Sequence, residues 1–333
     1  MTRTFLKLLA AALASLAVFG SAQAQTKTIK FANQNAKGHP IVMGMEKFAE
    51  IVETRSAGKF KVNVFPGGAL GSDQANVSAL QGGTLEMAAM NSGILASVVK
   101  DFAIYDFPFL FANPKEADAI VDGPLGHSLH AKLEEKGMVG LAYYELGFRN
   151  ITNSKRPIAK VDDIAGLKLR VIPNPINVDW VSALGANPTP LPFPELYAAL
   201  EQKAVDGQEN PVATIQGAKL YEVQKFMTLT NHQYNPQSVV ISKKFWDTLS
   251  ADEKKILQDA AHESAGYQRT QSRAQLQSGL EDLKKGGMQI TELSPAEVTK
   301  LRDKMKPVIA KHSASVGEAT VSSMMAELDK LRK

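Results

Sequence analysis

Short apolar segments alternate with helical ones through the first half of the chain, and this alternation restricts the fold more than any other feature. The predicted strands are residues 28–33, 60–65 and 85–90, and the predicted helices are residues 40–56 and 73–81. Glycines stand where the two helices should end, at Gly58 and at Gly82-Gly83. Strand–helix–strand repetition of this kind predicts an α/β fold, with a parallel or mixed sheet covered by helices.

The same alternation returns in the middle of the chain and then gives way to long helices. The predicted strands there are residues 140–145 and 167–172, and the predicted helices are residues 175–184 and 193–204. Ser250 and Glu253 have the spacing of a capping box and open about 35 residues of helical pattern. Ser294 and Glu297 have the same spacing before another helix. A long helix after the βα units indicates two lobes with one helix that spans both.

Residues 1–24 have the pattern of an export signal. Basic residues precede an apolar run over residues 8–19, and Ala22-Gln23-Ala24 matches a small-x-small cleavage site. The apolar run is about 12 residues long, whereas a bilayer span needs roughly 20. We therefore expect a periplasmic protein that starts near Gln25, with about 300 residues left for two domains.

Composition and motifs argue against several classes of function. The chain has no cysteine, which rules out disulfides and thiolate metal sites. Its formal net charge of +4 includes two basic residues of the export signal, and it has no run of five or six like charges. It also lacks G-x-S-x-G, H-E-x-x-H and Walker A motifs. We expect no nucleic-acid partner, no cofactor and no enzymatic activity.

His127 and His130 are three residues apart and lie next to a glycine. A metal site needs further ligands held nearby, and the surrounding sequence suggests none. We therefore expect both histidines to be exposed residues of a helix, and we expect no metal site.

The stretch GLKLRVIPNP, residues 166–175, places Arg170 near the end of a predicted strand that a Pro-Asn-Pro turn stops. Arg149, Asn91 and Asn210 also stand at or after the ends of predicted strands. Ligands of open α/β sheets bind beyond the carboxyl ends of the strands, and a guanidinium holds a carboxylate through two parallel hydrogen bonds. The four residues predict a site for an oxygen-rich anion. For each arginine the alternative is a surface ion pair, which contributes roughly 0–1 kcal/mol.

Five longer segments carry a family resemblance. They are FPGGALGSDQANVSALQGGTLEMAAM (65–90), GFRNITNSKRPI (147–158), DIAGLKLRVIPNP (163–175), LGANPTPLPFPELYAALEQKAVDGQENP (184–211) and YEVQKFMTLTNH (221–232). Together they closely resemble the solute-binding proteins of tripartite ATP-independent periplasmic (TRAP) transporters, of the DctP type. The resemblance covers nearly all of the chain after the export signal. It implies a two-lobed periplasmic binding-protein fold, with mixed sheets in each lobe and a long hinge-spanning helix.

The resemblance also implies roles for individual residues. Arg170 matches the usual carboxylate clamp of the family, while Arg149 and Asn210 match residues that add hydrogen bonds to the ligand. Phe193 matches an aromatic residue that packs on the ligand, with a buried core residue as the alternative. The other candidates are Gln34, Asn91, Asn174, Ser72 and Asp73. Relatives that bind sialic acid have a glutamate in place of Asn91, so the resemblance does not extend to that ligand.

By resemblance, the protein captures a small organic acid between its lobes and delivers it to the small and large permease subunits of a TRAP transporter. C4-dicarboxylates and sugar acids both suit the candidate residues, and keto acids and aromatic acids remain open. We expect a monomer. The expected lobes are residues 25–148 with about 236–276, and residues 149–235 with about 277–333. The alternatives are a binding protein of an ATP-driven importer and an exported α/β enzyme that acts on a carboxylate.

Overall fold

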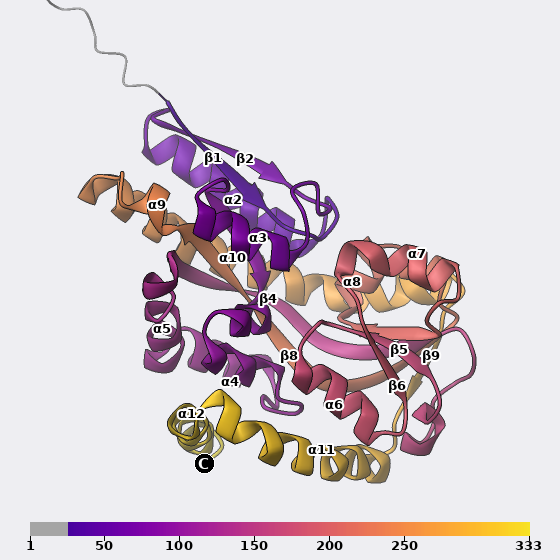
Figure 1. The fold of residues 1–333 in the computed structure, drawn as a ribbon. Helices are drawn as coiled ribbons and strands as arrows, with labels where there is room; N and C mark the ends of the chain where they lie inside the picture. Colours follow the sequence, from indigo (N-terminus) through magenta and orange to yellow (C-terminus); the bar gives the residue numbers. More distant parts are fainter. Residues whose placement is uncertain (1–25) are drawn as a thin grey trace, which may run out of the picture.

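The computed structural model describes residues 26–333, so the predicted export signal lies outside the described residues. Figure 1 shows two groups of strands and helices joined by long central strands. The strands are β1 (Lys27–Ala32), β2 (Phe60–Phe65), β3 (Met87–Asn91), β4 (Met138–Asn153), β5 (Lys168–Val171), β6 (Asn187–Pro190), β7 (Gly207–Asn210), β8 (Phe226–Ser242) and β9 (Gln289–Glu292).

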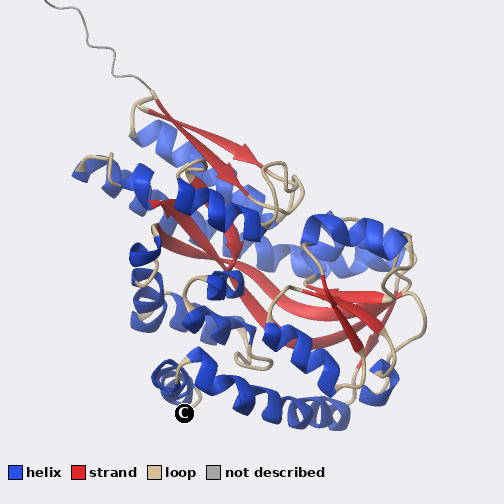
Figure 2. Ribbon diagram, in the orientation of Figure 1, coloured by secondary structure: helices blue, strands red, loops and turns tan. Residues whose placement is uncertain are grey.

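Helices lie on both sides of these strands (Figure 2). The α-helices are α2 (Pro40–Arg55), α3 (Asp73–Gly82), α4 (Pro114–Val121), α5 (Pro124–Ala131), α6 (Pro175–Ala183), α7 (Leu196–Glu201), α8 (Val212–Gly217), α9 (Lys243–Trp246), α10 (Ala251–Lys285), α11 (Pro295–Val316) and α12 (Glu318–Leu331). The short 3-10 helices include η2 (Lys100–Asp106) and η5 (Phe193–Glu195). No helix in the described part of the chain combines the length and the apolar character that a membrane span needs.

The strands form one mixed sheet in the order β2-β1-β3-β8-β4-β7-β5-β6, with β9 beside β8. β1 is parallel to β2 and β3, and β5 is parallel to β6 and β7, as expected for strands joined by helices. β4 and β8 are 16 and 17 residues long and pair antiparallel along most of their length. The α/β fold is confirmed, and the sheets of the two lobes are continuous because β4 and β8 belong to both.

β4 is irregular at the point where it crosses from one lobe to the other. Its register against β8 shifts between Glu145 and Gly147, and again between Arg149 and Ile151. Gly147 has a φ of 109°, a backbone conformation that glycine adopts far more readily than other residues. Bulges of this kind bend a strand and increase its twist. The bend of the sheet therefore lies next to Arg149.

The long helix α10 contacts both lobes, as the sequence predicts. It packs against α2 and β4 in one lobe, and Gln216 Nε2 in α8 of the other lobe donates a hydrogen bond to its Asp282 at 2.9 Å. At its start, Ser250 Oγ accepts a hydrogen bond from Glu253 N while the Glu253 carboxylate accepts one from Ser250 N. This is the predicted capping box.

Some local predictions are wrong. Ser294 caps α11, but the Glu297 carboxylate accepts a hydrogen bond from Val161 N at 2.6 Å instead of completing a second capping box. The helix expected over residues 193–204 is divided into η5 and α7. The sequence pattern also does not reveal β8, because most of its residues are buried and the alternation that marks a half-exposed strand is missing.

The expectation that His130 is exposed is also wrong. Its side chain is buried, because α5 packs against β4 and brings the imidazole onto Tyr143, with ring centroids 3.8 Å apart. His130 Nε2 lies 3.1 Å from Ser238 Oγ. The residue is therefore part of the packing between helix and sheet.

The two C-terminal helices contact elements of both expected lobes. α11 packs against α6 and η2, and α12 packs against α4. Arg332, just after α12, forms an ion pair with Glu116 of α4 at 2.8 Å. Figure 1 shows α11 running along one edge of the molecule, beneath α6.

The close contact between α2 and α10 gives a first testable prediction. A Cβ atom added at Gly44 would lie 2.7 Å from the side chain of Gln268, and this side chain bonds the backbone N and O of Glu145 at 2.7 and 2.8 Å. Gly44→Ala should therefore lower the free energy of unfolding by about 1–3 kcal/mol through overpacking.

The matched control is Gly266→Ala, an exposed position of α10 with no atom within 4 Å of the added Cβ. This variant should gain up to about 1 kcal/mol from helix propensity. Urea unfolding of the two variants measures the difference. Equal stabilisation of both would show that α2 and α10 do not touch at Gly44.

Candidate ligand-binding site

Eleven residues from both lobes line a cavity where the sheet bends. They are Gln34, Asn35, Asn91, Leu146, Arg149, Arg170, Ile172, Phe193, Asn210, Thr214 and Gln237. The space between atoms in this cavity is about 260 Å³, part of which is open to solvent. Only about 20 Å³ of it can hold the centre of a water molecule, so the two lobes lie close together around it.

Six of the predicted residues meet at this cavity. They are Arg170, Arg149, Asn210, Asn91, Phe193 and Gln34. Strand pairing explains why they converge, because β7 lies between β4 and β5. Arg149 on β4, Asn210 on β7 and Arg170 on β5 therefore stand on three neighbouring strands. Asn91 ends β3 and Gln34 follows β1, in the facing lobe. The strand-end pattern therefore identifies residues that do lie together.

Arg170 is buried, with 2% of its surface exposed. Its Nε donates a hydrogen bond to Leu191 O at 2.8 Å, and its guanidinium carbon lies 5.9 Å from the centre of the Phe193 ring. Burial lowers the pKa of Arg170 to about 10, so the side chain keeps its charge at neutral pH. In the described chain no carboxylate lies within 4.0 Å of this guanidinium. Arg170 is therefore not part of a surface ion pair.

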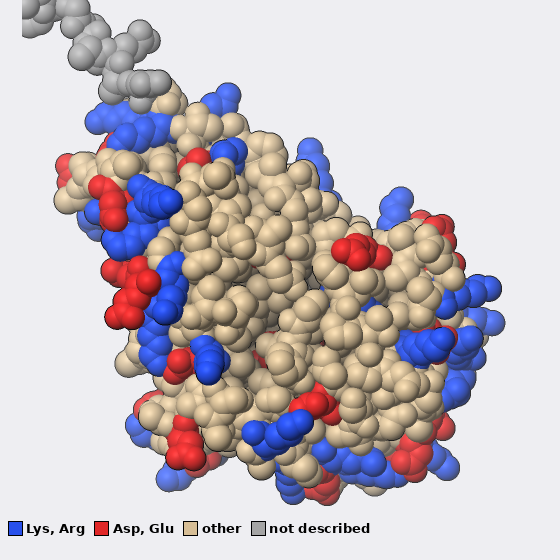
Figure 3. Space-filling view, viewed as in Figure 1, with Lys and Arg blue, Asp and Glu red and all other residues tan. Residues whose placement is uncertain are grey.

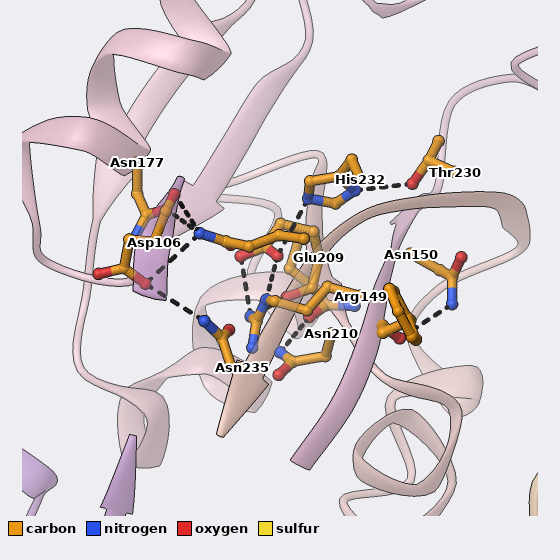
Figure 4. Close-up of polar contacts among 12 residues, drawn as sticks. Asp106, Arg149, Asn150, Asn177, Glu209, Asn210, Thr230, His232 and Asn235 are labelled. Carbon is orange, nitrogen blue, oxygen red and sulfur yellow. Dashed lines mark hydrogen bonds and ion pairs between the residues drawn. The ribbon is translucent and has the colours of Figure 1, made fainter. Parts of the chain in front are cut away.

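Arg149 is fully buried and paired with Glu209 of β7 (Figure 4). Its Nε contacts Glu209 Oε2, and its Nη2 donates a hydrogen bond to Oε1 at 2.8 Å. Burial opposes ionisation of Glu209, but the Arg149 guanidinium beside it brings the pKa of Glu209 down to about 2. Glu209 is thus ionised at neutral pH. Arg149 is neither a surface ion pair nor an unpaired charge.

His232 of β8 completes this buried cluster. Its Nε2 lies 3.4 Å from Glu209 Oε2, and its Nδ1 lies 2.7 Å from Thr230 Oγ1. Burial lowers the pKa of His232, although the Glu209 carboxylate acts in the opposite direction. The imidazole also packs against Trp180, with ring centroids 4.6 Å apart. Glu209 and His232 together hold the Arg149 guanidinium in one orientation.

Four buried N–H groups on the cavity wall have no hydrogen-bond partner in the described structure. They are Arg149 Nη1, Asn35 Nδ2, Asn91 Nδ2 and Gln237 Nε2. Two of these amides are fixed at their other end, because Asn91 Oδ1 accepts from Gly93 N at 2.9 Å and Gln237 Oε1 accepts from Asn33 Nδ2 at 3.1 Å. An unpaired buried donor costs about 1–3 kcal/mol. A ligand with several oxygen atoms would pair all four.

Asp73 lies behind the cavity wall. It is buried, and its Oδ2 accepts hydrogen bonds from Gln34 Nε2 and from Asn91 N, both at 3.0 Å. Burial raises the pKa of Asp73 to about 7, against the opposing effects of the Asn91 N–H and of Arg170. Asp73 thus positions two residues of the wall without lining the cavity itself.

Ser72 and Asn174 do not line the cavity either. Ser72 is the N-cap of α3, where its hydroxyl accepts from Ala75 N. Asn174 is the N-cap of α6, and its Nδ2 donates a hydrogen bond to Asp106 Oδ2 at 2.8 Å. Both side chains therefore cap helices and contribute to the stability of the fold.

The sequence pattern does not identify Asn35, Gln237 and Thr214, which also line the cavity. Asn35 directly follows Gln34 after the first strand, so the strand-end pattern could have included it. Gln237 lies inside β8 and Thr214 inside α8, and no turn or motif marks either position. Only the three-dimensional pairing of β8 places Gln237 at the site.

The charged residues that line the cavity, Arg149 and Arg170, are buried and do not belong to the charged surface of the protein. On the face shown in Figure 3, lysine, arginine, aspartate and glutamate side chains gather around the edges, and few cover the region between the lobes. Within the described residues no group of three histidine, aspartate or glutamate side chains could hold a metal ion.

The fold and the cavity define a two-lobed binding protein for a small ligand. The family model for bacterial extracellular solute-binding protein, family 7 (DctP), matches residues 31–315. The chain belongs to this family of transport proteins, which confirms the resemblance seen in the sequence.

Solved structures and a curated relative agree with this assignment. A TRAP periplasmic solute-binding protein from Ochrobactrum anthropi is 55% identical, with a TM-score of 0.83 over 93% of this chain and 97% of that chain. A sugar acid binding protein from Advenella mimigardefordensis, in complex with galactonate, is 42% identical, with a TM-score of 0.91 over 92% of this chain and 99% of that chain. The 2,3-diketo-L-gulonate-binding periplasmic protein of Escherichia coli is 35% identical over 278 residues, which are 84% of this chain and 85% of that protein.

We expect the buried Arg149–Glu209 pair to contribute much more to the free energy of unfolding than an exposed ion pair does. Glu209→Ala leaves the Arg149 charge buried and unpaired, which should lower the free energy of unfolding by about 3–5 kcal/mol. Asp247→Ala breaks an exposed pair with Lys243, whose atoms are 2.8 Å apart, and should cost at most about 1 kcal/mol. Urea unfolding of both variants tests this expectation. Similar losses in the two variants would mean that Arg149 is solvated in solution.

His39 joins the two lobes at the edge of the cavity. Its Nε2 lies 3.1 Å from Thr214 Oγ1 in α8, and its Nδ1 accepts a hydrogen bond from Ile41 N at 3.1 Å. Because Nδ1 is an acceptor, the ring is neutral and its proton is on Nε2. Burial lowers the pKa of His39 to about 3.

This histidine should make stability depend on pH. Unfolded His39 binds a proton near pH 6.5, whereas the folded residue does so only near pH 3, so acid favours the unfolded chain. The contribution is complete above pH 6.5 and is lost as the pH falls towards 3, by up to about 1.4 kcal/mol per pH unit. His39→Asn keeps a capping side chain that does not titrate. Its free energy of unfolding should fall less steeply between pH 6.5 and 4.5, and parallel curves for both proteins would contradict the prediction.

Proposed function

We propose that the protein is the extracytoplasmic receptor of a TRAP transporter and captures a small organic acid in the cavity between its lobes. The bound acid is then delivered to the small and large permease subunits in the membrane. The observation that carries this proposal is the buried guanidinium of Arg170, which has no carboxylate partner among residues 26–333 and shares the cavity with four unpaired N–H donors. A carboxylate would accept two parallel hydrogen bonds from this guanidinium.

The comparisons support the same class of ligand. Relatives of this chain carry the names of acids such as galactonate and 2,3-diketo-L-gulonate. These are small, oxygen-rich anions, as the donor groups of the cavity require. Sugar acids and C4-dicarboxylates are both compatible with an arginine clamp.

Binding is coupled to closure of the two lobes about the bend in β4 and β8. We assign residues 25–148 with about 236–276 to one lobe, and residues 149–235 with about 277–333 to the other. Closure around a ligand is the usual movement of periplasmic binding proteins. Gln34 and Asn91 reach the cavity from one lobe, and Arg170, Phe193 and Asn210 reach it from the other, so a ligand in the cavity holds the lobes together.

An exported enzyme that acts on a carboxylate is less well supported. Thr214 is the hydroxyl on the cavity wall, and the nitrogen that faces it is His39 Nε2. This nitrogen carries the imidazole proton, because Nδ1 accepts from Ile41 N. It therefore cannot take a proton from Thr214, which a nucleophile–base pair would require.

Arg170 variants test the clamp. Arg170→Ala removes both charged hydrogen bonds to the ligand and leaves its carboxylate buried without a partner, which costs about 3–5 kcal/mol, so the affinity should fall by about two to three powers of ten. Arg170→Lys keeps the charge without the planar fork and should recover only part of the loss. Calorimetric titration with galactonate gives the affinities.

Melting curves without ligand separate a clamp from a structural role. Arg170 takes part in no ion pair in the described chain, so the Tm of both variants should stay close to that of the unmodified protein. Full affinity in Arg170→Ala, or a large loss of Tm without ligand, would end the clamp hypothesis.

A further inference from the structure

The residues that line the cavity carry one positive charge that is not paired with a carboxylate in the described structure. Arg149 and Arg170 are the only charged residues among the eleven that line it. The charge of Arg149 is offset by Glu209, with which it forms a bidentate ion pair. In the part of the chain that the structure describes, Arg170 has no carboxylate partner. The lining therefore offers one unpaired guanidinium to a ligand, and Asp73 behind the wall adds negative charge only.

The rest of the wall is built from neutral amides. Asn35, Asn91 and Gln237 each present an N–H donor that is unpaired within the described residues. Gln34 donates its Nε2 to Asp73, and Asn210 donates its Nδ2 to Gln208 Oε1 at 2.6 Å, so the oxygens of these two amides remain as acceptors. The wall thus offers donors and acceptors together. A hydroxyl group can use both, whereas a carboxylate is only an acceptor.

Asp73 makes the amide wall unfavourable for a second carboxylate. Its side chain directly contacts Gln34 and the backbone of Asn91 from behind. A carboxylate placed against these residues would lie close to the Asp73 carboxylate, which already acts on Arg170 from behind the wall. Burying a charge without a partner is strongly unfavourable.

We propose that the site selects a monocarboxylate with hydroxyl groups along its carbon chain and rejects the dicarboxylate of the same length. This inference rests on the proposed function and narrows it. Arg170 and Arg149 Nη1 hold the carboxylate, and the amides of Gln34, Asn35, Asn91 and Gln237 hold the hydroxyl groups. Asp73 is a positioning residue that orients Gln34 and disfavours a second negative charge.

Two matched pairs of acids test the selection. Erythronate and meso-tartrate have four carbons, and galactonate and galactarate have six; within each pair only the terminal CH₂OH is replaced by a carboxylate. Calorimetric titration at pH 8, where Asp73 is ionised, should give a Kd at least about 100-fold lower for the monocarboxylate of whichever pair binds, equivalent to two steps of tenfold in affinity.

The outcomes separate the two proposals. Equal or tighter binding of tartrate or galactarate would overturn the selection for monocarboxylates and leave the receptor function standing. If neither pair nor any other organic acid binds, both proposals fail.

Asn35→Ala tests contact with a hydroxyl group. The Asn35 side chain makes no hydrogen bond in the described structure and lines the cavity, so its removal should leave Tm unchanged. It should weaken binding of the monocarboxylate about fivefold to tenfold, the effect of one lost hydrogen bond. Asn63→Ala, in β2 and away from the cavity, is the matched control and should change neither quantity. Unchanged affinity in Asn35→Ala would contradict the contact.

Asp73→Asn tests the rejection of the second carboxylate. The substitution keeps an oxygen for Gln34 and Asn91 and removes the negative charge. The ratio of affinities between galactonate and galactarate, or between erythronate and meso-tartrate, should fall by about tenfold or more. An unchanged ratio in a variant that still binds the monocarboxylate would overturn the role of Asp73.

Discussion

The buried ion pair between Arg149 and Glu209 determines the geometry and the charge of the site. Removing two ions from water costs several kcal/mol for each, and only good geometry recovers this cost. Here the recovery comes from two contacts between the side chains and from His232, whose Nε2 lies 3.4 Å from Glu209 Oε2. The pair joins β4 to β7 beside the bend of the sheet. It also offsets the charge of Arg149, so that Arg170 is the unpaired guanidinium on the cavity wall of the described structure.

Much of the candidate site can be predicted from the sequence, because polar residues at the ends of strands come together in this fold. Arg170, Asn91 and Asn210 stand at strand ends, and strand ends of an α/β sheet converge on the ligand. The same rule also selects Asn174, which the fold uses as a helix cap. Local sequence cannot distinguish these cases, because asparagine is favoured both at caps and in polar sites. The strand-end rule does not predict Gln237, because this residue lines the cavity from the middle of β8.

The fold itself is predictable where local signals are strong. The capping box and the uninterrupted helical pattern identify α10 almost residue by residue. β8 is missed because a strand buried on both faces has no alternation. His130 is placed wrongly for a related reason: which face of a short helix is buried depends on Tyr143 in a neighbouring strand. Such long-range contacts are absent from the spacing of residues within one segment.

The continuity of β4 and β8 through both lobes limits how the two lobes can move. A flexible linker would let them diffuse apart, and the cost of bringing them together would be conformational entropy. Here the connection is a pair of hydrogen-bonded strands backed by α10. Relative movement must bend both strands together, and it meets an elastic restoring force instead of an entropic one. The closure that we propose would therefore strain the same two strands that carry Arg149 and His232, and release of this strain would move the lobes apart again.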